Sequence, residues 1–182
     1  QLGLLMATPV LTGSISRLFL GVLTDRFGGR WVFGLLMLVT ATCVYLLTFA
    51  NSYVMLLVGA LGIGLAGGSF IVGVAYTSAW FEKERQGTAL GIFGAGNVGA
   101  AVTNFGAPFL LMAMGWKSTA LVYATIMAIM GVAFILLAKE DPQNQSRNAV
   151  RLPLSEQFAP LADLRVWRFS LYYFFVFGGF VA

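Results

Sequence analysis

The sequence predicts an all-α membrane protein, built as a bundle of helices that cross the bilayer several times. Of its 182 residues, 59% are hydrophobic and only 10% are charged, whereas a soluble domain has about half and about a quarter, respectively. The apolar residues form continuous runs of about 20 residues, the length that a helix needs to cross a hydrocarbon core of about 30 Å. These runs do not alternate between polar and apolar residues as the strands of a membrane barrel do.

Five complete apolar runs follow one another between short polar segments. The expected spans are Leu2 to Leu23, Trp31 to Ala50, Val54 to Trp80, Gly87 to Leu111 and Ser118 to Ala138. A sixth run begins near Phe169, and the first residue is Gln1 rather than Met. We therefore expect a fragment with a partial transmembrane bundle at 1–138, a cytoplasmic interdomain loop at 139–168 and the truncated start of a second bundle at 169–182.

Lysine and arginine are distributed very unequally between the two sides of the predicted bundle. The connection around 115–118 carries only Lys117, and the one at 50–53 carries none. The opposite side carries nine, namely Arg26, Arg30, Lys83, Arg85, Lys139, Arg147, Arg151, Arg165 and Arg168. The positive-inside rule therefore places the basic side in the cytoplasm. The charges of the long loop at 139–168 could bind anionic lipid headgroups or simply be solvated.

The first run contains an arginine, Arg17, inside the apolar segment. If Asp25 marks the cytoplasmic end of this helix, Arg17 lies about 12 Å deeper, near the bilayer midplane. A charge at that depth is costly, and no acidic residue lies within a span to pair with it. The guanidinium could bind a planar anion through its fork of donors. Alternatively, Arg17 could reach toward the interface or bind backbone carbonyls.

The third run is rich in glycine, including Gly64 and Gly68, and such a helix can approach its neighbours closely. Phe70 follows these glycines, and an aromatic side chain there is more often a packing residue than a ligand.

The fourth run places an amide, Asn97, at about the same depth as Arg17. Its side chain could project into a cavity or make an interhelical hydrogen bond, and spacing alone does not separate the two. Gly91 and Gly99 belong to a face of small residues along which another helix could pack. Pro108 is expected to kink or end the helix on the outer side.

Several classes of site have too few residues to be built. The chain has no histidine and a single cysteine, Cys43, within the second run. We therefore expect no metal site, no haem and no disulfide within the chain, and no cofactor. No nucleophile and base pair or phosphate-binding loop is recognisable, so we expect no catalytic residues and no enzyme activity. Because the basic residues lie in loops between spans, they do not indicate nucleic-acid binding.

The loop after the first run resembles a motif of the major facilitator superfamily. The segment "GVLTDRFGGR" matches the pattern G-x-L-x-D-R-x-G-x-R through Gly21, Leu23, Asp25, Arg26, Gly28 and Arg30. One departure is Trp31, where a further basic residue is usual. The resemblance implies a partial major facilitator fold, with helices two to six and the start of helix seven. It also implies that the motif acts as a cytoplasmic latch; the alternative is that its charges serve only topology and solvation.

Within that superfamily, "GAGNVGAAVTNFGAP" and "GLAGGSF" resemble segments of the nitrate/nitrite porters. The resemblance implies that Arg17 binds the anion, Asn97 hydrogen-bonds it and Phe70 covers one face of it. Tyr173 resembles a substrate-contacting tyrosine of helix seven, with Tyr172 as the rival if the register slips by one. A second arginine of the family's site would lie in the C-terminal half of the same polypeptide, outside these residues.

The expected function is secondary transport of nitrate or nitrite across the cytoplasmic membrane by alternating access, which would serve nitrate assimilation. Because no acidic residue or histidine lies in a span, this half offers no proton carrier, which favours antiport over symport. Alternatives are transport of another small anion, such as formate or oxalate, and a non-transporting anion sensor with the same fold. A channel is a further alternative, although a midplane arginine suggests a binding step.

Overall fold

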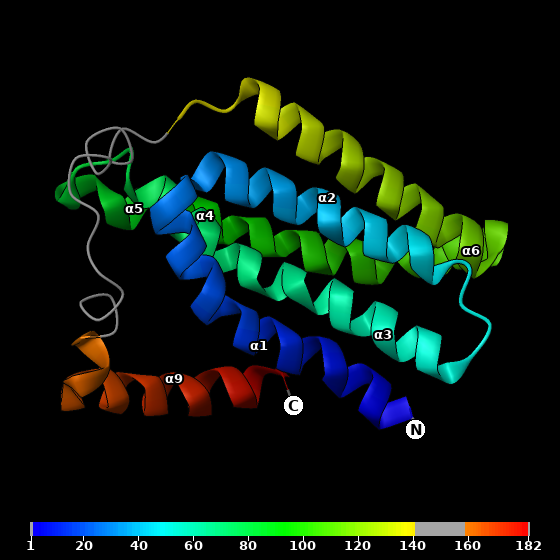
Figure 1. The fold of residues 1–182 in the computed structure, drawn as a ribbon, viewed down its shortest axis with the longest axis horizontal. Helices are drawn as coiled ribbons and strands as arrows, with labels where there is room; N and C mark the ends of the chain where they lie inside the picture. Colours follow the sequence, from blue (N-terminus) through cyan, green and yellow to red (C-terminus); the bar gives the residue numbers. More distant parts are fainter. Residues whose placement is uncertain (1, 141–158, 182) are drawn as a thin grey trace. The chain divides into compact units, whose positions relative to one another are not determined.

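The computed structural model describes residues 2–140 and 159–181 and divides the chain into two compact units, residues 1–146 and 147–182. The described part of the first unit consists of helices α1 (Leu2–Phe27), α2 (Gly29–Leu47), α3 (Tyr53–Gly64), α4 (Ser69–Ser78), α5 (Lys83–Gly94) and α6 (Val98–Leu137), with two short 3₁₀ segments, η1 (Leu65–Gly68) and η2 (Ala95–Asn97). Figure 1 shows α1, α2 and α3 running side by side, with the end of α6 along α2. The chain is thus an all-α, multi-pass membrane protein, as the sequence predicts.

The first two helices meet at a single residue, Gly28. Its backbone has φ 83°, a conformation that L side chains rarely adopt, and its N–H donates to the carbonyl of Thr24 at 2.9 Å. The motif segment expected to be a loop is therefore mostly helical, because Asp25 and Arg26 form the last turn of α1. Arg26 is stabilised there by the negative end of the helix dipole. The apolar run ends at Leu23, but the backbone hydrogen bonding of the helix continues for four more residues, to Phe27.

The third expected span is one continuous path from α3 through η1 to α4. Ser52 caps its start, since its side chain accepts a hydrogen bond from the N–H of Met55 at 3.3 Å. The glycine-rich middle of this path adopts the tighter 3₁₀ geometry at η1. A 3₁₀ turn inside a helix redirects its carbonyl groups and allows a close approach to α1.

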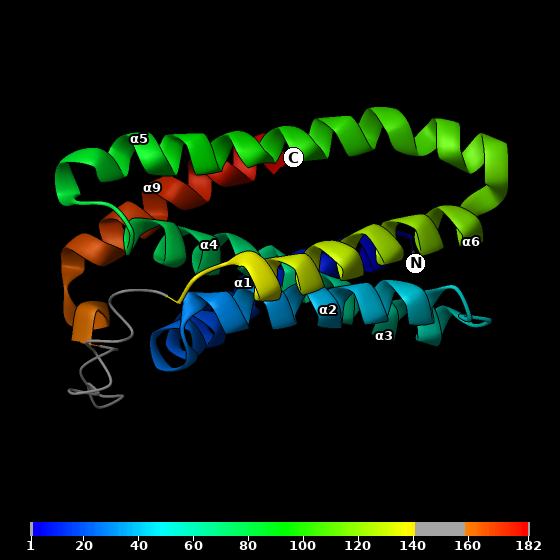
Figure 2. The ribbon, with the colours of Figure 1, turned by 90° about the horizontal axis from the view of Figure 1, so that it is seen from above.

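The fourth and fifth expected spans are separate helical segments, and Figure 2 shows the chain reversing direction between them. The residue at which the helix is interrupted is Gly115. Gly115 has φ 75° and ψ 168° and is the only residue within α6 whose backbone is not helical. By length and hydropathy, residues Lys83–Leu137 form one apolar stretch of 55 residues, which this reversal divides into the two spans. Of the two outcomes expected at Pro108, a kink or an end, the end is wrong, because the helix continues through this residue. It ends at the glycine, because only glycine adopts this backbone conformation without strain.

The core of the first unit lies where α1, α2 and α4 meet. Its buried side chains are Leu20, Val32, Leu36 and Val72, with Phe33 and Leu65 packed against them. The end of α6 packs on α2, with Gly34 beside Ile135 and Gly131 beside Leu38. In contrast, large apolar side chains between η2 and Gly115 are exposed, among them Phe105 at 76% and Met112 at 88%. That stretch has the surface of a helix that faces lipid or further protein.

The second unit contains η3 (Ala159–Ala162) and α9 (Leu164–Val181). We expected this helix to start near Phe169, but it begins five residues earlier. The side chain of Asp163 accepts a hydrogen bond from the N–H of Arg165 at 2.9 Å and so caps the first turn. Hydropathy missed this turn because Arg165 and Arg168 are charged. Most of the interdomain loop expected at 139–168, namely residues 141–158, lies outside the described residues.

We expect Gly115→Ala to destabilise the protein by about 1–3 kcal/mol, because an alanine would be strained in this glycine-only backbone region. Thermal unfolding in detergent measures the effect. Gly106→Ala is the matched control, since Gly106 lies in the same helix and nothing surrounds the position of its Cβ within 4 Å. An unchanged melting temperature for Gly115→Ala would contradict this account of the reversal.

Candidate functional site

Arg17 lies on α1 at the point where that helix crosses η1. Its Nε donates a hydrogen bond to the backbone carbonyl of Gly67 at 3.2 Å, and the residue is half-buried. This contact is the carbonyl-binding alternative that the sequence left open for Arg17. It occupies one donor of the guanidinium, which carries five N–H groups. The Gly67 contact by itself therefore does not exclude an anion contact.

Close packing of glycines brings Gly67 to Arg17. A Cβ added to Gly13 would lie 3.0 Å from the Gly64 carbonyl oxygen and 3.2 Å from the Gly67 Cα. Gly64 itself faces Pro9 and Thr12, and Gly68 faces Ser16 and Leu20. Gly64 and Gly68 thus lie in contact with α1, where side chains would force the helices apart.

Phe70 lies on α4, which contacts both α1 and η1, whereas Asn97 lies on η2, which contacts α5 and α6. Phe70 is the second residue of α4, three residues after Gly67, and its ring lies 5.5 Å from that of Phe93 on α5. Asn97 follows one turn after Phe93, at the end of η2. Its side chain is exposed and makes no capping hydrogen bond to α6. The structure thus brings Gly67 to Arg17 and Phe93 to Phe70. The role of Asn97 at the anion stays a prediction.

Tyr173 and Tyr172 lie on α9 in the second unit, with 53% and 55% of their surfaces exposed. The ring of Tyr172 lies 6.4 Å from that of Phe169. The role of Tyr173 at the anion stays a prediction.

Gly91 and Gly99, expected to pack against another helix, have nothing within 4 Å of the position that a Cβ would take. Their role in packing also stays a prediction.

The motif segment contacts the C-terminal end of α6 through Arg30. Its Nε donates to the Ile135 carbonyl at 2.8 Å, and its Nη2 donates to the same oxygen. Nη1 lies 4.0 Å from a carboxylate oxygen of Glu140, and the guanidinium carbon lies 5.5 Å from the centre of the Trp31 ring. Ile135 is in the last turn of the helix, where carbonyls lack an intrahelical partner. Arg30 thus caps α6, and its charge complements the helix dipole.

Tyr76 is a second contact to the same helix end, and our sequence reasoning missed it. Its hydroxyl donates to the Lys139 carbonyl at 2.7 Å, and its ring lies 5.7 Å from that of Phe134. The ring also packs on Gly29 of the motif, where a Cβ would lie only 2.7 Å from it. Because Tyr76 is 47 residues from Gly29 in the sequence, no local pattern indicates this pair. The remaining motif residues sit nearby in the chain, with Gly21 on α1 and Asp25 exposed.

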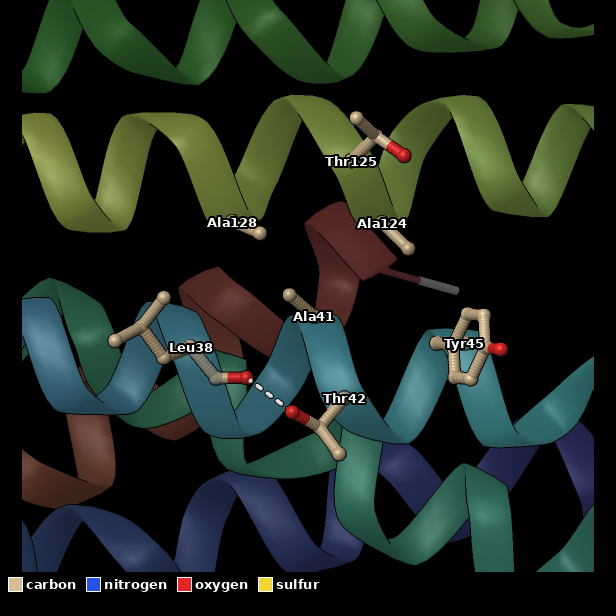
Figure 3. Close-up of a pocket in the computed structure, with 7 residues that line it drawn as sticks. All are labelled: Leu38, Ala41, Thr42, Tyr45, Ala124, Thr125 and Ala128. Atoms are coloured by element: carbon tan, nitrogen blue, oxygen red, sulfur yellow. Dashed lines mark hydrogen bonds between the residues drawn. The ribbon is translucent and has the colours of Figure 1, made fainter.

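A hollow of about 270 Å³ lies between α2 and the second part of α6. Figure 3 shows the residues that line it, Leu38, Ala41, Thr42, Tyr45, Ala124, Thr125 and Ala128. Thr42 donates to the Leu38 carbonyl and Thr125 to the Leu121 carbonyl, both at 2.8 Å. With its two threonine hydroxyls donating to their own helices and no charge in its lining, this hollow is a poor anion site. Within residues 2–140 and 159–181, no group of three His, Cys, Asp or Glu side chains could hold a metal ion.

Comparison with known proteins gives one family and a set of related sequences. The family described as Major Facilitator Superfamily matches residues 1–182. The chain is 44% identical to the "Probable nitrate/nitrite antiporter NarK1" of Thermus thermophilus, over 100% of the chain and 43% of that protein. It is 35% identical to the "Nitrite extrusion protein" of Bacillus subtilis, over 100% of the chain and 45% of that protein. It is also 36% identical to the "Probable nitrate transporter NarT" of Staphylococcus epidermidis, over 100% of the chain and 46% of that protein.

The chain therefore spans less than half the length of these curated relatives. No solved structure matches it.

We expect Arg30→Lys to loosen the end of α6 by about 1 kcal/mol, because a lysine loses the planar fork that donates to Ile135 and the stacking on Trp31. Hydrogen exchange of the amides at 134–140 should become several-fold faster. Arg26→Lys is the matched control, since Arg26 is exposed at the end of α1. Equal exchange in the two variants would show that Arg30 does not hold this helix end.

Proposed function

Because the chain belongs to the major facilitator superfamily, we propose that it is the N-terminal part of a transporter that moves nitrate or nitrite across the cytoplasmic membrane. Transport occurs by alternating access, with the anion held between two helical halves that rock around it. The relatives from Thermus, Bacillus and Staphylococcus supply the substrate class, since their names describe nitrate and nitrite transport. The chain alone holds about half of such a site, and the C-terminal half of the same polypeptide supplies the rest.

The observation that carries this proposal is the position of Arg17. It lies ten residues inside the cytoplasmic end of α1, at a depth of about 15 Å along the helix. A guanidinium remains charged at any ordinary pH and offers paired N–H donors in one plane. Nitrate and nitrite are planar anions whose oxygens accept such paired hydrogen bonds. Weakly hydrated, delocalised charge on both partners lowers the cost of bringing them together in a site with little water.

The neighbouring residues complete this half of the site. Phe70 lies two residues after the end of η1, and its ring covers a face of an anion bound at Arg17. Asn97 donates a hydrogen bond from its amide without adding a charge, which suits a monovalent anion. Tyr173, on α9, contacts the anion when the two halves of the transporter are closed.

The motif at the cytoplasmic end acts as a latch in this mechanism. Arg30 holds the end of α6, where the connection to the second half begins. Asp25 and Arg26 act electrostatically in one closed state and do not contact the substrate. A latch placed at the start of this connection couples movement of the second half to the first.

We expect Arg17→Lys to abolish saturable uptake of labelled nitrate and nitrite into vesicles that contain the full-length protein. A lysine keeps the charge but cannot donate two coplanar hydrogen bonds to one anion. Arg85→Lys is the matched control, since Arg85 is exposed in the first turn of α5 and outside the proposed site. Uptake at the parental rate in a correctly inserted Arg17→Lys variant would remove Arg17 from the site. Without uptake of either anion by the parent, a panel with formate and oxalate would test the carboxylate alternative, and nitrate binding without flux would indicate a sensor.

We propose that exchange of nitrate for nitrite provides the driving force for transport. The apolar spans of this chain contain no acidic residue or histidine that could carry a proton, and the Thermus relative is named an antiporter. We expect vesicles loaded with nitrite to take up nitrate several-fold faster than empty vesicles, with no change when a protonophore is added. Proton uptake that follows nitrate uptake, and that is lost on changing a residue within this chain, would overturn the exchange mechanism.

A further inference from the structure

The contact between Arg17 and Gly67 determines how an anion can approach the guanidinium. A guanidinium has two edges that can hold a planar oxyanion with paired donors. One edge is formed by Nε and one Nη, and the other by the two Nη groups. The Gly67 carbonyl accepts from Nε at 3.2 Å and thus occupies the first edge. An anion held by paired donors therefore has to use the second edge.

We propose that the backbone carbonyl of Gly67 is the positioning group for Arg17, and that it directs the Nη1–Nη2 edge of the guanidinium toward the anion. This inference rests on the proposed function and adds the geometry of binding to it. The hydrogen bond joins a charged donor to a backbone dipole, so it orients the guanidinium without neutralising its charge.

The Gly67 carbonyl reaches Arg17 only because α1 and η1 lie unusually close. Gly13 is one turn before Arg17, and a Cβ on Gly13 would lie 3.0 Å from the Gly64 oxygen and 3.2 Å from the Gly67 Cα. From the other side, a Cβ on Gly67 would lie 3.0 Å from the Gly13 Cα. All these neighbours are backbone atoms, which cannot rotate away as side chains do. An alanine at either position therefore has to push η1 away from α1.

A small displacement is enough to break the bond. Hydrogen bonds of this type have donor–acceptor distances of about 2.7–3.2 Å, and a separation of about 3.6 Å no longer counts as one. Since the Nε to oxygen distance is already 3.2 Å, a shift of a few tenths of an ångström breaks this hydrogen bond. The glycines at 13 and 67 are thus required by the orientation of Arg17 as well as by helix packing.

The first test compares uptake kinetics of Gly13→Ala and Gly67→Ala in the full-length protein in vesicles. We expect each variant to raise KM for nitrate by about tenfold, the factor that corresponds to one lost hydrogen bond of this strength, with Vmax within twofold of the parent. The double variant should be no worse than either single one, because both break the same contact.

Two controls separate orientation from general strain. Gly59→Ala introduces crowding in α3, where the new Cβ would lie 2.3 Å from a methyl group of Leu47, away from Arg17. Gly3→Ala introduces a methyl group on α1 with nothing within 4 Å. Neither should change KM. A KM that rises equally in Gly59→Ala would overturn the proposal, as would a KM within twofold of the parent in both test variants.

A second measurement needs no altered glycine. In ¹⁵N-labelled full-length protein in bilayers, with the Arg17 signals assigned by their loss in Arg17→Lys, added nitrate should shift the Nη resonances more than the Nε resonance. A larger shift at Nε would place the anion on the edge that Gly67 occupies and overturn the proposal. If the parent neither takes up nor binds nitrate, the proposed function fails and this inference with it. If nitrate transport depends on Arg17 but the larger shift is at Nε, the role of Gly67 is rejected and the proposed function stands.

Discussion

The close crossing of α1 with the glycine-rich segment 64–68 is the contact on which the rest of the first unit depends. Helices in a bilayer gain little from hydrophobic association, because lipid tails are as apolar as their side chains, and they associate through tight packing and hydrogen bonds. Gly13, Gly64 and Gly67 allow backbone to approach backbone at this crossing. The same crossing brings Leu20 and Val72 into one core and sets Arg17 beside a carbonyl. Packing and the proposed function therefore depend on the same few glycines.

Backbone carbonyls at the end of α6 impose a second constraint beside the motif segment. The last turn of α6 presents carbonyl groups that its own helix does not satisfy. Arg30 donates to the carbonyl of Ile135 in this turn, and Tyr76 donates to the carbonyl of Lys139, two residues after the helix ends. These bonds join the motif loop, α4 and the start of the interdomain connection. The conformational role proposed for the motif would therefore depend on hydrogen bonds that cap the end of α6.

The stretch between η2 and Gly115 differs from the other helices because its apolar side chains are mostly exposed. Hydropathy predicts such a helix as well as a buried one, since a bilayer and a protein core both favour apolar residues. For the same reason it does not indicate which face packs. Asn97, Gly91 and Gly99 could be singled out from their types and spacing, but their roles stay predictions, since Asn97 is exposed and nothing lies within 4 Å of a Cβ at either glycine.

The sequence by itself determined the membrane class and the approximate spans, because these follow from residue type and from counting along the chain. It predicts their orientation and the depth of Arg17. It also indicated the motif, whose spacing is local. Only the tertiary structure decided that Gly115 rather than Pro108 ends a helix, that Asp25 and Arg26 complete α1, and that α9 begins at Leu164. It alone paired Arg17 with Gly67, Arg30 with Ile135 and Tyr76 with Lys139. Each pair joins residues 50 or more positions apart, and such contacts depend on how helices cross, which the pattern of side chains along one helix does not specify.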